Sequence, residues 1–364
     1  MLKTFSKILR WLVSIVLLVL ILLPGLVYLT TYHPDAIEDE KIISLAAAPQ
    51  LRPGQRLKIL TWNLQFLAGR PNNNFFFDGG SDPWPSLQTV TANAKAAANI
   101  IMQEDPDIVL LQELDDGAGR THYQDELQLI LDQLPTDYAV YTSSFYWLAD
   151  FVPHSELLGG VGMKMSIISK YRLASAKRYA LPAITTDDLL ARQYNLKRAI
   201  QGTYLPIEGG GKLNLLNTHL SAYAQGSDTM LRQVAMVDRV IGDYAAKGEP
   251  VLLAGDFNLL PNDDAYENLD AGSRKYYNKL GTEITPLLER YRSVPSLPET
   301  LGTDRREWFT HIANDNHSEM PDKTIDYVFY AGKLALREHY VRSADTLRIS
   351  DHLPVVASFM LTSN

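Results

Sequence analysis

The stretch VLLAGDFN, residues 251–258, has the pattern of a buried strand with a polar end. Its first four residues are apolar, and continuous apolar runs of this kind are typical of strands that are buried on both faces of a sheet. The run then ends in Asp256 and Asn258, one residue apart. Because a carboxylate on a buried strand is costly unless it is paired or bound to a metal ion, this strand end predicts a functional site.

The same pattern recurs along the chain, with a polar side chain at the end of an apolar, strand-like run. The other positions are Asn63, Glu113, His219, Asp326, and Asp351 with His352. Each alone has a structural reading, such as an Asx turn or a solvated strand end. Carboxylates aimed at one pocket repel one another, and a hard divalent cation removes that repulsion. Mg²⁺ suits such oxygen ligands, and Mn²⁺ is accepted by similar sites. Together the positions predict a metal-assisted hydrolytic site.

Helical and strand-like segments alternate after residue 57. The Ala-rich segment 86–106, the segment 123–135 and the segment 227–248 have helical spacing, and short β-rich runs separate them. Interleaved helices and buried strands predict a layered α/β domain. No change of composition divides it, so residues 57–364 are expected to form one catalytic domain.

The N-terminus has the composition of a membrane anchor. Residues 11–29 carry no charge, and 19 helical residues span roughly 28 Å, close to the thickness of a bilayer core. We expect residues 1–33 to form a cytoplasmic tip and a single transmembrane helix, and residues 34–56 to form a polar stalk. The basic residues before the helix predict a cytoplasmic N-terminus and a domain on the other side, periplasmic in a bacterium. The alternative is a cleaved signal peptide, whose apolar region is usually shorter.

Charge and cysteine content limit the classes of function. The 364 residues include 34 Lys and Arg, 42 Asp and Glu, and no Cys. The net charge of −8 gives no overall attraction to a polyanion, which disfavours nucleic acid as a partner. The absence of Cys excludes disulfides and Cys-ligated zinc.

Six short motifs, in their order and spacing, resemble those of the endonuclease/exonuclease/phosphatase superfamily over residues 57–361. They are TWNLQ, DIVLLQE, NTHL, GDFN, IDYVF and SDH. The resemblance implies a four-layer αββα sandwich of two mixed sheets. It also implies Mg²⁺-dependent attack of water on a phosphoester. The chain lacks the Pro-x-Trp-Cys-Asp-Arg stretch of the inositol phosphatases, so that subgroup is not expected.

The resemblance implies a role for each acidic or amide strand end. Metal ligands would be Asn63, Glu113 and Asp351, with Glu113 the main one; Asp351 would either help to bind the metal or orient a histidine. Asp256 would orient or deprotonate the attacking water. Asn258 would hold a phosphate oxygen or the metal.

The resemblance also implies roles for the imidazoles. His219 would contact the phosphate or protonate the leaving group. Asp326 would orient His352, which would stabilise the transition state or act as the base. The resemblance does not decide between these two roles of His352.

Three further side chains are candidate substrate contacts: Lys170 in ISKYRL, Arg198 and His154. Basic side chains on a solvated face are the alternative. Two aromatic-rich stretches, 69–86 and 143–160, are expected either to dip into a membrane interface, to stack on a base, or to pack beneath the loops.

These features predict a membrane-anchored, Mg²⁺-dependent phosphodiesterase that acts on a lipid headgroup or another small phosphoester. The first alternative is a tethered nuclease acting on DNA or RNA. The second is a non-catalytic binding module with the same fold. The sequence does not indicate an oligomeric state.

Overall fold

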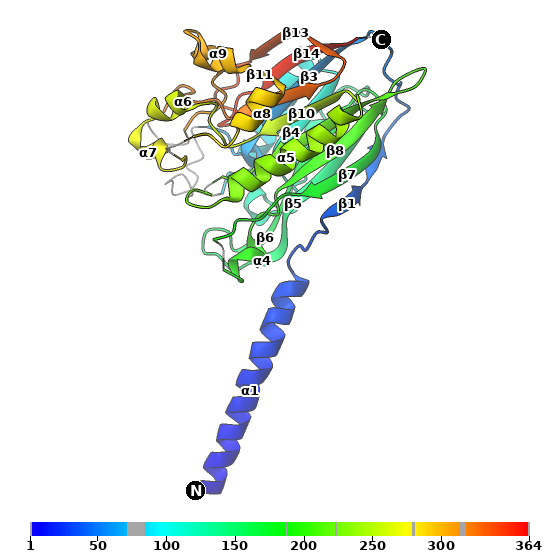
Figure 1. Cartoon of the computed structure of the whole chain (residues 1–364). Helices are drawn as coiled ribbons and strands as arrows, with labels where there is room; N and C mark the ends of the chain where they lie inside the picture. Colours follow the sequence, from blue (N-terminus) through cyan, green and yellow to red (C-terminus); the bar gives the residue numbers. More distant parts are fainter. Residues whose placement is uncertain are drawn as a thin grey trace.

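The computed structural model describes most of the chain as two packed sheets with surrounding helices, from which one long helix, α1, projects (Figure 1). The described residues are 2–70, 84–186, 188–222, 224–278, 281–313 and 318–362. Phe75, Phe76 and Phe77 belong to the aromatic-rich stretch 69–86, and they lie outside the described residues.

Two mixed sheets of seven strands each form the centre of the described chain. The first has the order β1 (Ile37–Glu40), β7 (Ala174–Ala180), β8 (Ala199–Pro206), β9 (Lys212–His219), β10 (Val251–Asp256), β12 (Asp326–Ala331) and β11 (Arg292–Val294). The second has the order β13 (Leu334–Val341), β14 (Val355–Leu361), β3 (Arg56–Asn63), β4 (Ile108–Asp115), β6 (Gly159–Ser169), β5 (Val140–Val152) and β2 (Ile42–Ser44). The parallel pairs are β9–β10 and β3–β4.

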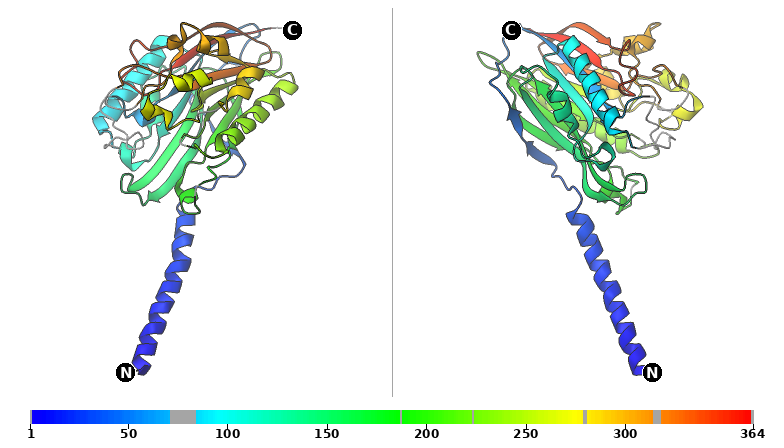
Figure 2. Two further views of the ribbon diagram at one scale, coloured as in Figure 1. Left: turned by 60° about the vertical axis from the view of Figure 1, so that its left-hand side comes forward. Right: turned by 180° about the vertical axis from the view of Figure 1, so that it is seen from behind.

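Apart from α1, the described helices lie around the two sheets (Figure 2). The helices of the described chain are α1 (Leu2–Leu29), α2 (Leu87–Glu104), α3 (Glu126–Leu131), α4 (Ala191–Tyr194), α5 (Thr229–Ala246), α6 (Asp263–Glu267), α7 (Ala271–Arg274), α8 (Thr285–Arg290) and α9 (Leu297–Leu301). Short 3-10 turns are η1 (Gln65–Leu67), η3 (Gly119–Thr121) and η4 (Arg305–Trp308).

The layers follow from alternating side chains on the central strands. Ile59 and Leu110 of one sheet meet Leu215 and Leu252 of the other in a fully buried inner core. Burying one such side chain stabilises the fold by roughly 1.5–3 kcal/mol.

Helices cover the opposite faces of both sheets. The apolar stripe of α2, including Ala97 and Ile101, packs on the second sheet, and that of α5, including Val237 and Ile241, packs on the first. The four-layer αββα sandwich that the resemblance implied is therefore confirmed.

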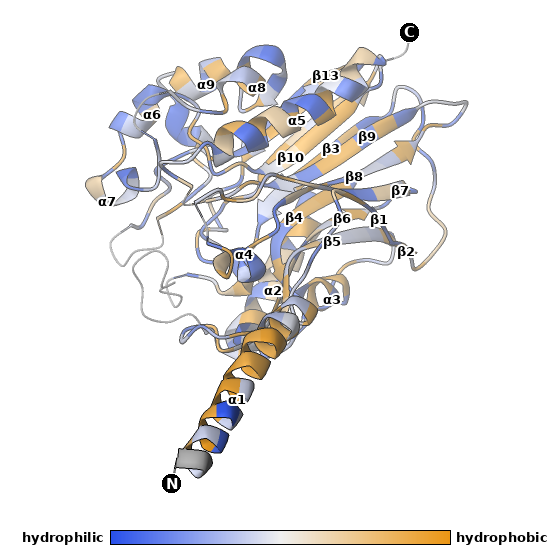
Figure 3. Ribbon diagram, turned by 60° about the horizontal axis from the view of Figure 1, so that its bottom comes forward, coloured by the Kyte–Doolittle hydropathy of each residue, from blue (hydrophilic) through white to orange (hydrophobic). Residues whose placement is uncertain are grey.

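Helix α1 is apolar and lies outside the domain. The span Thr4–Leu29 is long and apolar enough to cross a bilayer, and none of it is buried against the rest of the protein. Figure 3 shows this helix as largely orange, hydrophobic, with blue, hydrophilic turns toward its N-terminal end. Its length and composition fit a membrane span or a signal sequence.

The segment 34–56 is not the polar stalk expected from the sequence. It supplies β1, paired with β7, and β2, paired with β5, so it lines the edges of both sheets. The strands are only four and three residues long, too short for a clear alternation of apolar and polar residues. Their backbone pairing holds the start of the domain close to α1.

Glu104, at the end of α2, gathers three partners from the second sheet. Its carboxylate accepts hydrogen bonds from Lys58 Nζ (2.6 Å), Arg342 Nη1 (2.9 Å) and the Tyr340 hydroxyl. Burial raises the pKa of Glu104, but these partners outweigh it and bring the pKa below the usual 4.5. The ionised carboxylate therefore fastens α2 to the sheet.

Replacing Glu104 by glutamine is expected to lower the free energy of unfolding at pH 7 by about 1.5–3 kcal/mol, the usual contribution of hydrogen bonds to a charged group. A lowered folded-state pKa stabilises the protein above the unfolded pKa, and that stability is lost as the pH falls through the folded value. Urea unfolding should thus separate wild type from Glu104→Gln at pH 7 and much less near pH 3. The exposed Glu289→Gln is the control; an equal loss in both variants would contradict the role of Glu104.

Candidate active site

The ends of strands from both sheets meet at one place. β3 ends at Asn63, and β4 carries Glu113 beside it. In the other sheet, Asp256 lies opposite His219 on the parallel strand β9 and opposite Asp326 on the antiparallel strand β12. Residues far apart in the sequence therefore line the same edge.

A bulge in β4 places Glu113 toward this edge. The pairing of β4 with β6 shifts between Leu111 and Leu114, and Glu113 has a positive φ of 53°. Such bulges re-aim a side chain. The backbone NH of Glu113 donates to the Tyr146 hydroxyl at 3.1 Å, which holds the irregular backbone in place.

The turn after β10 is equally specific. Gly255 has a φ of +146°, and a Cβ there would lie 1.9 Å from the Thr218 carbonyl oxygen, so only glycine fits. Asn258 has a φ of 52° and donates its backbone NH to Asp256 Oδ1 at 2.9 Å. Its amide also donates to the Leu220 carbonyl at 3.2 Å. Asn258 therefore fixes the orientation of the Asp256 carboxylate while lining the cleft.

Asn63 lies between the two sheets, buried behind Glu113 and Asp256. Its Nδ2 donates to Glu113 Oε1 at 3.1 Å and to Asp256 Oδ2 at 3.0 Å. Its Oδ1 accepts the backbone NH of Gln65 at 2.9 Å. This arrangement presents the amide NH₂, and not the oxygen, to the carboxylates, so Asn63 orients them.

His219 is held as a neutral imidazole. Its Nδ1 lies 3.3 Å from the Tyr146 hydroxyl, and its Nε2 lies 3.3 Å from Asp256 Oδ2. Burial, together with the positive charges of Arg198 and His352, lowers the pKa of His219 well below its usual value. Neutral His219 can therefore donate from Nε2 to the Asp256 carboxylate without carrying a charge.

His352 has the opposite protonation. Burial disfavours the charged imidazole, but Asp326 and Asp256 outweigh burial and raise the pKa of His352 well above its usual value. Its Nδ1 lies 2.8 Å from Asp326 Oδ2, and its Nε2 lies 3.5 Å from Asp256 Oδ2. The Trp62 indole donates to the His352 carbonyl at 2.8 Å and fixes the backbone. The site thus places a cationic imidazole beside the central carboxylate.

The pKa of Asp256 is set by burial and by the charged groups around it. Burial raises its pKa, the charge of His352 lowers it and that of Asp326 raises it, with a resulting pKa of about 7. A divalent cation would favour the ionised form. Glu113 and Asp256 share the Asn63 amide, and Asp351 lines the same cleft, so these three carboxylates could hold such a cation. This oxygen-rich donor set fits Mg²⁺ or Mn²⁺.

His311 belongs to the site and was not predicted from the sequence. Its ring meets that of His352 edge-on, with centroids 4.7 Å apart, and its Nε2 lies 4.0 Å from Asp351 Oδ2. Asp351 lies in the same wall, next to Ser350, whose hydroxyl donates to the Asn63 carbonyl at 2.8 Å. His311, Asp351 and His352 form a second group of closely spaced ligand atoms. His311 follows no apolar run, so no strand-end pattern marks it.

A cleft of about 690 Å³ opens over these residues, within the usual size range of ligand pockets. Arg198 and His154, two of the predicted substrate contacts, line it. Lys170, the third, does not. It follows β6 at the end of β4 opposite to Glu113, where it pairs with Asp105 and Asp137. The prediction for Lys170 was wrong because the Ser-Lys-Tyr motif lies at the far edge of the sheet.

The Arg198 guanidinium has an unused hydrogen-bond donor. Its guanidinium lies over the Tyr146 ring, 5.2 Å from the centroid. Its Nη1 is buried and has no hydrogen-bond partner among the described residues. A cation of this kind beside His219 is suited to a phosphate oxygen.

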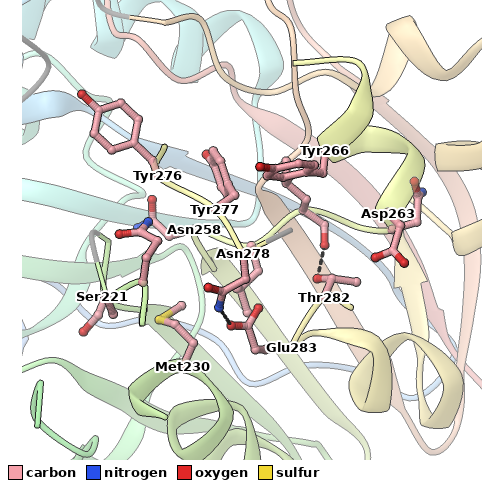
Figure 4. Close-up of a pocket in the computed structure, with 15 residues that line it drawn as sticks. Ser221, Met230, Asn258, Asp263, Tyr266, Tyr276, Tyr277, Asn278, Thr282 and Glu283 are labelled. Atoms are coloured by element: carbon pink, nitrogen blue, oxygen red, sulfur yellow. Dashed lines mark hydrogen bonds between the residues drawn. The ribbon is translucent and has the colours of Figure 1, made fainter. Parts of the chain in front are cut away.

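A smaller pocket adjoins the cleft beyond Asn258 (Figure 4). Its walls include Ser221, Tyr266 and Tyr277, and Asn278 donates to Glu283 along one side. The volume of about 30 Å³ leaves room for about two water molecules. The larger cleft is therefore the candidate substrate site.

The sandwich and its acid–imidazole cluster define a class of phosphoesterase and nuclease folds. Residues 60–352 match the model of the Endonuclease/Exonuclease/phosphatase family, and the chain belongs to this family. Membership of this family supports the assignment of the protein as a hydrolase. Among curated proteins, none matches the chain significantly.

Several solved structures share the fold. An endonuclease/exonuclease/phosphatase from Beutenbergia cavernae is 22% identical, with a TM-score of 0.57 over 85% of this chain and 72% of that one. TDP2 from Caenorhabditis elegans is 19% identical, with a TM-score of 0.52 over 85% and 75%. The human Nocturnin catalytic domain, solved with a sulfate anion, is 17% identical, with a TM-score of 0.50 over 89% and 98%.

Proposed function

We propose that the protein is a divalent-cation-dependent phosphodiester hydrolase, tethered to a membrane by α1, that acts on a lipid headgroup or another small phosphoester. One observation carries the proposal. Asp256 lies between a neutral imidazole, His219, and a cationic one, His352, at 3.3 and 3.5 Å. That arrangement provides a proton acceptor and a positive charge at the same point.

Each side chain then has a defined task. Glu113 would hold the cation together with Asp256, and Asp351 would extend the acidic wall toward it. The bound cation would polarise the phosphoryl group and lower the pKa of water. Asp256 orients and deprotonates the attacking water. His352 stabilises the negative charge that develops on the phosphate, and His219 contacts the phosphate or protonates the leaving group.

The choice of substrate rests on the tether and on charge. A membrane helix keeps the domain within a short distance of lipid and raises the effective concentration there. The basic N-terminal flank favours a cytoplasmic N-terminus, with the domain on the other side of the membrane. The net charge of −8 gives no overall attraction to DNA or RNA. Lipid or small phosphoesters are therefore favoured over nucleic acid.

The test uses the full-length protein in nanodiscs with Mg²⁺, before and after EDTA. Hydrolysis of bis-p-nitrophenyl phosphate that EDTA abolishes and Mg²⁺ or Mn²⁺ restores would support the proposal. Plasmid nicking in the absence of phosphate-headgroup release from phospholipid vesicles would favour a nuclease instead. No hydrolysis of any of these phosphoesters would favour a non-catalytic binding module.

Arg198→Ala is expected to lower kcat/KM for bis-p-nitrophenyl phosphate about 10- to 100-fold, mainly through KM, because a hydrogen bond to a charged group contributes about 1.5–3 kcal/mol. Steady-state kinetics checks this prediction. Lys170→Ala, which removes a basic side chain outside the cleft, is the matched control. Equal kinetics in both variants would remove Arg198 from the phosphate site.

A further inference from the structure

The cleft has two chemically different halves. One half holds the acids and imidazoles described above. The other, which we call the apolar arm, is walled by six largely apolar side chains: Phe66, Trp147, Val152, Leu157, Met163 and Leu196. An apolar wall beside a charged centre suits a ligand that has both a charged and an apolar part.

The apolar arm is bounded by the turn between β5 and β6 and by the segment leading into α4. The Trp147 indole donates to the Tyr194 carbonyl at 2.6 Å and joins the two segments. Beyond the arm, three apolar side chains on these segments face solvent. They are Phe151 (48% exposed), Leu158 (60%) and Leu189 (80%), and we call them the apolar rim. Single exposed apolar side chains are ordinary, but each of these three is next in sequence to a residue that lines the cleft, and a group of exposed apolar side chains suits an interaction surface.

The apolar rim lies beside the end of α1. Thr30 accepts a hydrogen bond from the backbone NH of Asp150 at 2.9 Å, and Tyr32 donates to the Leu148 carbonyl at 3.1 Å. The chain leaving the helix therefore pairs with β5 immediately before Phe151. Figures 1 and 2 show α4 and the ends of β5 and β6 at the end of the domain from which α1 projects. If α1 crosses a bilayer, the apolar rim lies at its surface.

We propose that the apolar arm binds the hydrocarbon part of a phospholipid substrate, which enters from the bilayer across the apolar rim. The inference rests on the proposed function, since it needs both the membrane helix and phosphoester hydrolysis. The phosphate then lies between Arg198 and the acid–imidazole centre, while the chain extends along Trp147 and Leu196. Burying the chain removes apolar surface from water on both partners.

The apolar arm is tested with methyl and octyl p-nitrophenyl phosphate, using full-length protein in nanodiscs. Each buried methylene should improve KM about two- to fourfold, so kcat/KM is expected to be at least 100-fold higher for the octyl probe. Leu196→Ser, which leaves partition of the probe into the nanodisc unchanged, is expected to lower the octyl-to-methyl ratio about tenfold. Equal kcat/KM for both probes, or an unchanged ratio in Leu196→Ser, would overturn the arm as a chain site. Failure to hydrolyse either probe would instead overturn the proposed function itself.

The apolar rim is tested with the triple variant Phe151→Ser, Leu158→Ser, Leu189→Ser. Hydrolysis of octyl p-nitrophenyl phosphate embedded in phosphatidylcholine vesicles is expected to fall at least tenfold. Hydrolysis of the soluble methyl probe and the unfolding temperature should stay as in wild type, because these side chains are exposed and lie outside the cleft wall. The control, Leu231→Ser with Leu301→Ser, removes two leucines that are at least half exposed, on α5 and α9. If the rim and control variants lose the same activity on vesicles, the membrane contact is elsewhere.

Discussion

Replacing Asp256 by asparagine is expected to lower kcat about 10³-fold. Asp256 is the acid that both imidazoles face, at 3.3 Å from His219 and 3.5 Å from His352. The amide cannot accept the proton of water, and a positioned base contributes about 10²–10⁴-fold. The substitution also removes one negative charge from the oxygen atoms that would bind the cation. Stopped assays with bis-p-nitrophenyl phosphate at saturating Mg²⁺ measure the loss.

The variant should fold as well as wild type. The carboxylate is buried and its pKa is raised to about 7, so a neutral amide of the same shape removes a buried charge. The unfolding temperature is therefore expected to be unchanged or higher. Asp264→Asn, at an exposed position of α6, is the matched control. Activity in Asp256→Asn within tenfold of wild type would exclude Asp256 as the proton acceptor.

Asp326→Asn is expected to lower kcat about 10²-fold with little change in KM. Asp326 is buried behind the cleft and acts through His352, whose Nδ1 it contacts at 2.8 Å. Partners of this kind fix the tautomer and orientation of an imidazole. Their loss leaves substrate binding in place but misorients the cation that stabilises the transition state.

The pH profile separates this role from a merely structural one. Asp326 helps to raise the pKa of His352, so removing its charge lowers that pKa. If protonated His352 is the active form, the decline of kcat at alkaline pH begins at a lower pH in Asp326→Asn than in wild type. An alkaline limb at the same pH in both proteins would show that His352 does not act as the cation.

The strand-end pattern made much of the site predictable. Apolar runs that stop at Asn63, Glu113, His219 and Asp256 mark strands whose ends must share an edge in a two-sheet sandwich, and the structure brings them together. Arg198, which the sequence offered as a substrate contact, precedes β8, the strand next to β9, and lines the cleft. The register of Asp256 with His219 and Asp326 adds what the sequence cannot give, the distances between them.

Other features depend on tertiary contacts that leave no local trace. His311 reaches the site from a loop, through pairing with Lys323 and His352, and its neighbours in sequence have no strand pattern. The β4 bulge at Glu113 is set by the Tyr146 hydroxyl from another strand. Lys170 was predicted as a substrate contact from a motif. A motif gives the identity of a residue but does not show at which end of a strand the residue lies. Strands β1 and β2, within residues 34–56, pair with β7 and β5 at the edges of the two sheets. Their structure therefore depends on sheets formed by later parts of the chain.

Binding of Mn²⁺, followed by electron paramagnetic resonance, tests the cation site without relying on turnover. Wild-type protein is expected to bind Mn²⁺ in competition with Mg²⁺, and Glu113→Gln to bind it at least tenfold more weakly, while Glu289→Gln matches wild type. Glu113→Gln that binds Mn²⁺ as tightly as wild type would show that the acids and imidazoles at the strand ends do not assemble around a divalent cation.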